Sequence, residues 1–224
     1  QTDFIATFLI SCLIVFALVF LVSYWRGKNL AAASFQGLSA SYSNTGYMGI
    51  PLCALALGQD GLAPAIISTF VVFVMFALAT IFIEIGILSH KKHHEIILSV
   101  LKSLCTNPLL IAPVAGLLWA SSGLVMYDPV AQVISFLAGA STPCALVSIG
   151  LFLMQKSDAS PSQTWGISAM KLLIQPLIAW FIAGPILNLP PLWLSAAVIL
   201  SALPTGTGPF MLAQYYKADG RLIS

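Results

Sequence analysis

Apolar residues along the chain occur in blocks of helical length that are separated by short polar segments. A bilayer core about 30 Å thick needs about 20 apolar residues in each spanning helix. Seven blocks approach that length, at residues 4–24, 30–57, 62–88, 104–121, 130–154, 165–187 and 192–216. Residues 95–105 are typical of a short amphipathic segment at the membrane surface. The pattern predicts an all-α polytopic membrane protein with seven transmembrane helices in one domain, residues 1–224.

Composition narrows the class of protein further. Of the 224 residues, 59% are hydrophobic and 7% are charged, with a formal net charge of +2. Soluble domains carry about 25% charged residues, so this chain has too few to cover a surface facing water. The composition excludes a nucleic-acid-binding protein, a disordered chain and a cytosolic enzyme of ordinary composition.

The cations predict the orientation in the membrane, because lysine and arginine are enriched in cytoplasmic loops. If the N-terminus lies outside, all nine cations fall on the inner side and three aspartates fall on the outer side. The cations are Arg26, Lys28, Lys91, Lys92, Lys102, Lys156, Lys171, Lys217 and Arg221. We therefore expect Gln1 on the outside and Ser224 on the cytoplasmic side.

The second and seventh blocks contain interruptions that ordinary spans lack. Residues 43–51 read Ser-Asn-Thr-Gly-Tyr-Met-Gly-Ile-Pro, and residues 204–209 read Pro-Thr-Gly-Thr-Gly-Pro. Proline removes an amide donor and glycine loosens the backbone, so both helices should unwind here. Unwound backbone is tolerated in a bilayer only where protein or a water-filled cavity covers it. Each break is therefore a candidate binding region.

The two breaks are related by an inverted repeat. Thr45-Gly46 and Thr205-Gly206 lie 160 residues apart (205 − 45), and the step between their blocks is five spans. Because five is odd, the helix that contains the second break crosses the membrane in the opposite direction to the helix that contains the first. Matching interrupted helices in inverted halves are typical of transporters with a binding site near the midplane. The repeat also predicts two further spans before this chain and one after it.

The helix ends at the breaks indicate the chemistry of the site. N-terminal amides and the positive end of the helix dipole favour an anionic group. Pro51 and Pro209 lie where each second half-helix would start, a position that suits proline. The candidate substrate-binding residues in the breaks are Asn44, Thr45, Gly46, Gly49, Pro51, Pro204, Thr205, Gly206, Thr207 and Pro209. The predicted site has no charged side chain and would hold a carboxylate without a buried cation.

Other polar residues have simpler interpretations. We expect Glu84 and Lys171 to extend toward the membrane interface, as long charged side chains do. The segment His90-Lys91-Lys92-His93-His94 is interpreted as a positive-inside anchor rather than a metal site. The four cysteines lack the close spacing of a zinc site and are interpreted as packing residues. No metal and no cofactor is predicted.

Four motifs, in order, resemble the auxin efflux carrier family, a branch of the bile-acid-transporter-like fold that includes bacterial malonate-type permeases. Residues 44–52 contain Asn-Thr-x-x-Met-Gly-Ile-Pro-Leu, and residues 203–216 contain Leu-Pro-x-Gly-x-x-Pro-Phe-x-x-Ala-x-x-Tyr. These are similar to the two crossover helices of the family. Asn107-Pro108 corresponds to its Asn-Pro motif, which adds Asn107 to the candidate site, and residues 148–152 contain Ser-x-Gly-Leu-Phe.

The resemblance implies an elevator-type carrier whose crossover helices belong to a transport part that moves against a scaffold part. It also implies a homodimer and a chain that covers helices three to nine of ten. The segment 156–163 is short, where many plant members have a long cytoplasmic loop. A compact prokaryotic type in the inner membrane is therefore expected.

The function hypothesis is a secondary carrier for a small organic anion, either a malonate- or malate-like dicarboxylate or an auxin-like carboxylate. No acidic residue lies in either break to hold a cation, so uniport or proton coupling is preferred to sodium coupling. The alternative is a seven-helix receptor or photoreceptor, with Lys171 as the retinal-linking candidate. An intramembrane enzyme ranks last, because the sequence contains no His-Glu-x-x-His and no acidic pair at mid-membrane.

Overall fold

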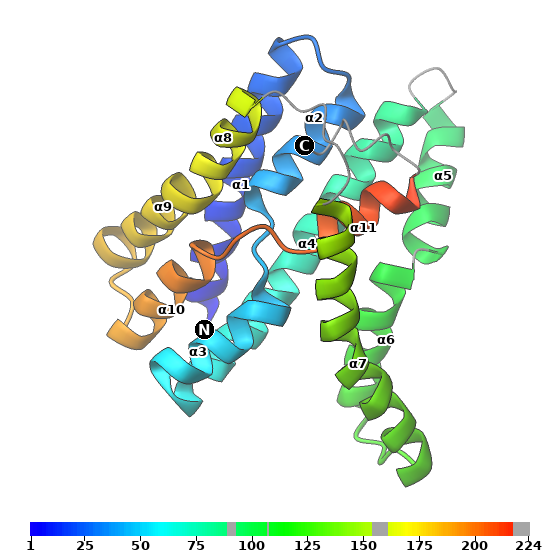
Figure 1. Ribbon diagram of the computed structural model, residues 1–224, viewed down its shortest axis with the longest axis vertical. Coiled ribbons are helices and arrows are strands. Elements are labelled where there is room, and N and C mark those ends of the chain that lie inside the picture. Colours follow the sequence, from blue (N-terminus) through cyan, green and yellow to red (C-terminus); the bar gives the residue numbers. More distant parts are fainter. Residues whose placement is uncertain (89–92, 107, 154–160, 217–224) are drawn as a thin grey trace. The chain divides into compact units, whose positions relative to one another are not determined.

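The computed structural model describes residues 1–88, 93–106, 108–153 and 161–216, which form helices and connecting segments with no β-strand. The α-helices are α1 (Thr2–Trp25), α2 (Leu30–Ser41), α3 (Ile50–Leu57), α4 (Leu62–Ile87), α5 (His93–Thr106), α6 (Pro108–Ser122), α7 (Asp128–Leu153), α8 (Pro161–Ala169), α9 (Gln175–Phe181), α10 (Pro191–Ser201) and α11 (Gly208–Tyr215) (Figure 1). Shorter π-helical segments span Thr45–Gly49, Met170–Ile174 and Ile182–Ile186, and a 3-10 turn spans Gln59–Gly61. The all-α prediction is confirmed.

Three helical stretches among the described residues are long and apolar enough to cross a bilayer, namely Thr2–Trp25, Gln59–Ile87 and Thr164–Ile186. They correspond to the first, third and sixth predicted blocks. The fourth block differs from its prediction, because the surface segment continues as α5 to Thr106 and the next helix starts at Pro108. Proline suits a first helical turn, where its missing amide is not needed.

The chain divides into two compact units. The first contains residues Gln1–Val100 and Asp158–Ser224, and the second contains Leu101–Ser157. The first unit therefore includes α1 to α4, α8 to α11 and both interrupted segments. The second unit is built around α6 and α7, two helices that contain neither interruption.

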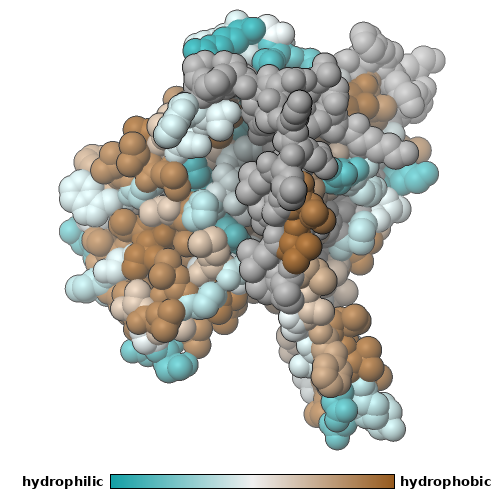
Figure 2. Space-filling view, viewed as in Figure 1, coloured by the Kyte–Doolittle hydropathy of each residue, from teal (hydrophilic) through white to brown (hydrophobic). Residues whose placement is uncertain are grey.

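Helix α1 is the central packing element of the first unit and contacts α2, α4, α9 and α10. Phe4, Phe8, Cys12 and Val15 are fully buried at intervals of four and three residues, which places them on one helical face. The opposite face carries exposed apolar residues such as Ile10 and Leu13. Figure 2 shows similar apolar areas on the outer surface over α9 and α10. Apolar residues on all sides are expected of a helix that faces protein on one side and lipid on the other.

Helix α2 is short and almost completely buried, with every residue from Ala31 to Ser41 enclosed. Its small residues permit close backbone contacts, as at other membrane helix interfaces. A Cβ atom added at Gly37 would lie 3.0 Å from the backbone oxygen of Phe16 in α1. The Asn29 side chain caps the helix start by accepting a hydrogen bond from the Ala32 amide at 2.7 Å. This burial brings the far end of α2 into the interior of the unit, where the first interruption begins.

Candidate transport site at the crossing of two broken helices

The first break begins where α2 ends at Ser41. Residues 42–44 are not helical, and the chain then turns into the π-helical segment Thr45–Gly49, which leads into α3. Pro51 lies in the first turn of α3, as predicted. The predicted interruption at residues 43–51 is therefore shorter in the structure, because the helix resumes at Thr45.

The second break begins where α10 ends at Ser201. Residues 202–207 are not helical, and α11 starts at Gly208 with Pro209 in its first turn. This break is longer than the first and has no π-helical turn. Unwinding was predicted for both segments and is confirmed for both.

The two unwound segments cross each other (Figure 1) and form an isolated antiparallel β-bridge between Ser43 and Thr205. The Asn44 amide donates to the Pro204 oxygen at 3.0 Å, and the Gly206 amide donates to the Tyr42 oxygen at 3.0 Å. These bonds satisfy backbone groups that unwinding would otherwise leave unpaired in the bilayer. The crossing thus brings together residues that are 160 to 164 positions apart in the sequence.

A side-chain bond and close packing reinforce the crossing. The Thr205 hydroxyl donates to the backbone oxygen of Ser39 at 2.7 Å, which satisfies one of the last carbonyls of α2. A Cβ atom at Gly206 would lie 2.9 Å from the Tyr42 ring and 3.1 Å from the Asn44 Cα. At Gly208 it would lie 2.4 Å from the same ring. A side chain at either position would clash with the Tyr42 ring, so glycine is strongly favoured at both.

Lys171 is a charged residue at the crossing. The expectation that its side chain extends toward the membrane interface is wrong. Its side chain is 1% exposed instead of extending to the interface. Its Nζ donates to the Ser43 hydroxyl at 2.7 Å, the Gln175 side-chain oxygen at 2.7 Å and the Ser201 backbone oxygen at 2.8 Å. The expectation of a site without a buried cation is therefore wrong.

The reason lies in where the sixth block begins. Counted from Trp165, Lys171 appeared close to the surface, but α8 begins at Pro161. Lys171 is ten residues from that start (171 − 161), which places it about 15 Å along the helix. The available signal was the pair Lys171 and Gln175, since positions four apart share one helical face. Ionisable residues inside a membrane segment are functional candidates by default.

Gln175 links the lysine to α1 and to the first break. Its Nε2 donates to the backbone oxygen of Ser41 at 3.2 Å and to the Cys12 sulfur at 3.3 Å. The side chain is fully buried. Cys12 was interpreted as a packing residue, and it is buried as expected but also accepts this bond. The result is a polar network in the interior that joins α1, α9 and both breaks.

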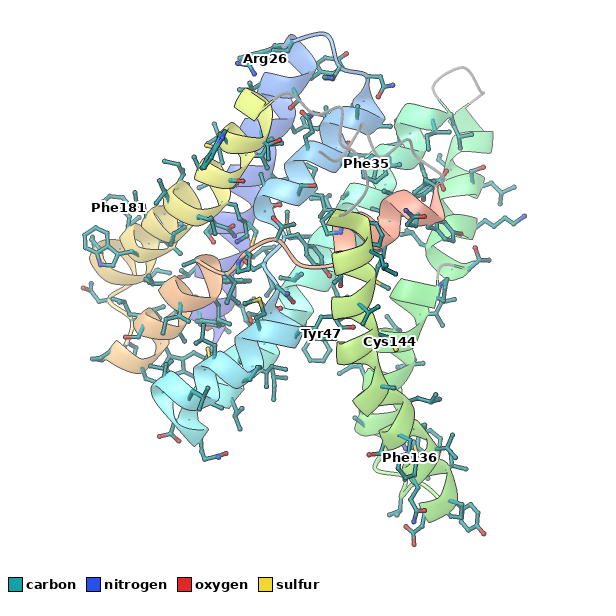
Figure 3. All side chains as sticks on the ribbon, viewed as in Figure 1. Arg26, Phe35, Tyr47, Phe136, Cys144 and Phe181 are labelled. Atoms are coloured by element: carbon teal, nitrogen blue, oxygen red, sulfur yellow. The ribbon has the colours of Figure 1, made fainter. Side chains whose placement is uncertain are left out.

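The remaining candidates occupy different positions around the crossing. Thr45 is buried at 1% exposure, whereas Asn44 and Thr207 are half-buried and Pro204 is exposed. At Gly46 an added Cβ atom would meet only the Thr69 methyl group, at 3.9 Å. In Figure 3, Tyr47 lies beside the first break, far from Arg26 at the end of α1.

Gly49 packs against α10 rather than against Tyr42. A Cβ atom at Gly49 would lie 2.8 Å from Leu200, so this glycine permits contact with α10. Asn107 lies outside the described residues. Glu84, which was expected to extend toward the membrane interface, accepts a hydrogen bond from the Tyr216 hydroxyl at 2.8 Å.

Two other features of the described residues do not suggest a polar binding site. A groove of about 640 Å³ between α1 and α9 is lined by apolar side chains, among them Ile10, Leu177 and Phe181, and suits lipid tails rather than a carboxylate. Within the described part of the chain, no group of three or more His, Cys, Asp or Glu side chains could hold a metal ion. The crossing is therefore the strongest candidate site in the first unit.

Comparison with known proteins identifies the function class. Residues 3–224 match the family described as membrane transport protein. A proposed malonate transporter of Rhizobium meliloti is 30% identical over 219 residues, covering 96% of this chain and 68% of the relative. An uncharacterized transporter of Methanocaldococcus jannaschii is 26% identical, covering 91% of this chain and 67% of the relative. Auxin efflux carrier component 8 of Arabidopsis thaliana is 25% identical over 142 residues, covering 58% of this chain and 37% of the relative.

These matches confirm the resemblance that the motifs indicated. The family and these relatives are transporters, so the function class is transport rather than catalysis. The apolar helices and the family together identify an integral membrane protein. The chain therefore belongs to the family of membrane transport proteins, in the branch that includes the auxin efflux carriers.

Proposed function

We propose that the protein is a secondary carrier for a small organic anion and that the substrate binds at the crossing of the two broken helices. The observation that carries the proposal is the hydrogen-bonded crossing of Ser43 with Thr205. Beyond it, a helical segment starts at Thr45 and α11 starts at Gly208, so two helix N-termini lie close to the bridge. The positive ends of the helix dipoles favour an anion there.

Lys171 supports the choice of an anion. Its ammonium group is bonded to Ser43, which itself belongs to the bridge. In a low-dielectric interior a single positive charge attracts an anion more strongly than it would in water. The same charge disfavours a cationic substrate at this place.

The substrate class is a short carboxylate. A malonate- or malate-like dicarboxylate is the first choice, since the Rhizobium meliloti relative is named as a malonate transporter. An auxin-like carboxylate is the second, from the name of the plant relative. Both would present a carboxylate to the helix N-termini, and they differ in the rest of the molecule.

An elevator mechanism is consistent with the division of the chain. Both broken helices belong to the unit formed by Gln1–Val100 and Asp158–Ser224, whereas Leu101–Ser157 forms a separate unit. A carrier of this kind would move the first unit with its bound anion against the second. We further propose a homodimer in a prokaryotic inner membrane, with Gln1 outside and a proton as the coupling ion.

The alternative of a receptor or photoreceptor is not supported by the structure. It relied on Lys171 as a residue free to bind retinal, but the three protons of this ammonium group each have an oxygen partner. The family consists of transporters, which supports the carrier instead.

The test is uptake of labelled malonate, malate and indole-3-acetate into proteoliposomes that contain the intact protein, with and without pH and sodium gradients. We expect saturable uptake of one acid that responds to the pH gradient and not to sodium. Absence of uptake for every acid, from protein shown to be folded and inserted, would exclude the anion assignment.

A pair of variants tests the site itself. Gly206→Ala places a methyl group 2.9 Å from the Tyr42 ring and 3.1 Å from the Asn44 Cα, and should separate the bridge. Gly166→Ala is the matched control, because nothing lies within 4 Å of an added Cβ atom there. We expect uptake to fall at least roughly tenfold in Gly206→Ala and to stay unchanged in Gly166→Ala. Equal uptake by both variants would contradict the site.

A further inference from the structure

The Lys171 ammonium group occupies a small site made of oxygen atoms. The three oxygens come from a hydroxyl, a side-chain amide and a backbone carbonyl, at 2.7 to 2.8 Å from Nζ. They belong to the first break, to the start of α9 and to the end of α10. An ammonium group has three donors, and all three are used here. Neutral oxygens of these kinds are also the usual ligands of hard metal cations.

The surroundings of this site favour a positive charge. Ser201 is the last residue of α10, and Ser43 lies two residues after the end of α2. The end of α10 therefore presents a backbone carbonyl to Nζ, and the end of α2 is joined to the same cluster because the Ser41 carbonyl bonds to Gln175. Helix C-terminal ends carry partial negative charge. The resulting attraction allows a buried cation whose three hydrogen-bond partners are all uncharged.

The same place contains a polar atom that the lysine does not use. The Ser201 hydroxyl is buried and has no hydrogen-bond partner among the described residues. Buried hydroxyls are normally paired, so an unpaired one calls for an explanation. The carbonyl of the same residue binds Nζ, so this unpaired hydroxyl belongs to one of the three residues that form the site.

We propose that Lys171 is a tethered cation, which fills a monovalent-cation site at the crossing and replaces an ion that would otherwise have to bind there. The site holds Ser43 and Ser201 together through one positive charge, so both broken helices depend on it. An untethered cation would have to enter and leave with each transport cycle, whereas Lys171 remains in place. The protein would then need no sodium at this position.

The proposal predicts that a shortened side chain converts the filled site into an open one. Lys171→Ala removes the stem and the ammonium group but keeps the oxygens of Ser43, Gln175 and Ser201. A small cation in solution can then take the vacated place. Methylammonium supplies the lost group directly, and sodium or ammonium can bind the same oxygens. Lys171→Met is the matched variant, because it fills the space of the stem and supplies no charge.

The experiment measures the thermal unfolding midpoint of the intact purified protein in choline, sodium, ammonium and methylammonium chloride at one ionic strength. The native protein should unfold at the same temperature in all four salts. Lys171→Ala should unfold at a lower temperature in choline and recover by several degrees, saturably, in at least one small cation. Lys171→Met and the exposed-site control Lys102→Ala should show no dependence on the cation.

Each outcome of this experiment either supports or contradicts the tethered cation. A Lys171→Ala protein with the same midpoint in all four salts would overturn the proposal. A variant that can be purified only with methylammonium, ammonium or sodium present would support it, and one that no cation recovers would overturn it.

A second readout, which rests on the proposed carrier function, is substrate uptake by Lys171→Ala in the same salts. Uptake should be lost in choline and restored by the cation that stabilises the variant. Because the unfolding measurement uses no substrate, it still decides on the tethered cation if the proposed anion transport fails.

Discussion

The two breaks match in sequence but differ in construction. In the first, three residues are unwound and Gly46 has open space around it, whereas in the second, six residues are unwound and Gly206 and Gly208 are pressed against Tyr42. Ser41 and Ser201 are equivalent by the offset of 160 (201 − 41), and each ends a half-helix. Both of their carbonyls accept hydrogen bonds from one helical face, through Gln175 and Lys171 respectively.

The equivalent face in the first half lies on α1, and it does not bond to the two helix ends in this way. Subtracting 160 from 171 and 175 gives Ser11 and Val15, and the Ser11 hydroxyl bonds to Phe8 within its own helix. One half of the repeat therefore provides the polar contacts for both helix ends. Inverted symmetry in the sequence determines where the breaks lie, whereas the chemistry at the crossing is asymmetric.

The largest stability effect is expected from breaking this asymmetric face. Gln175→Leu leaves the Ser41 carbonyl and one proton of the Lys171 ammonium group without their partners. Losing buried bonds of this kind, one of them to a charged group, should lower the free energy of unfolding by about 3 kcal/mol. Gln214→Leu, a change at an exposed glutamine of α11, should alter it by less than about 0.5 kcal/mol. Comparable unfolding midpoints for the two variants would show that the face is not a structural link.

The second effect concerns the two sets of glycines. Gly208→Ala forces a methyl group into the Tyr42 ring and should destabilise the protein by about 1–3 kcal/mol, the usual cost of overpacking. Gly46→Ala should change stability by less than about 1 kcal/mol, because the nearest atom is 3.9 Å away. Adding Tyr42→Leu to Gly208→Ala should recover part of the loss, since the two sites are in contact. The unfolding midpoints of Gly208→Ala, Tyr42→Leu and the double variant are compared. If the two single effects simply add up in the double variant, the proposed clash is contradicted.

The fold could be predicted from the sequence because the bilayer imposes strong constraints. Helical length and the breaking residues are local properties, so they identified three membrane-spanning helices and both interruptions. Lys171 could not be placed in the same way. Its depth depended on a helix start at Pro161, in a polar segment where the hydrophobic pattern gives no boundary. Its partners Ser43 and Ser201 lie 128 and 30 residues away, and only folding brings them together.

A smaller effect is expected at the hydroxyl that fastens the second break to α2. Thr205→Val keeps the shape of the side chain but removes its bond to the Ser39 oxygen, which should cost about 1 kcal/mol. Thr205→Ser retains a hydroxyl and should recover most of that loss. The measurement is again the unfolding midpoint of the purified protein. A Ser variant as unstable as the Val variant would mean that the methyl group matters more than the bond.

The smallest effect should come from the far end of α11, where the asymmetry continues. The Tyr216 hydroxyl donates to Glu84 of α4 at 2.8 Å, and the equivalent position in the first half, 216 − 160, is Ala56, which cannot form such a bond. Tyr216→Phe removes only the hydroxyl, from a site that is partly buried, so the loss should be about 0.5–1 kcal/mol. Glu84→Gln keeps an acceptor for the phenol and should cost less than Tyr216→Phe. If the Gln variant is the less stable of the two, the charge of Glu84 has a role beyond this bond.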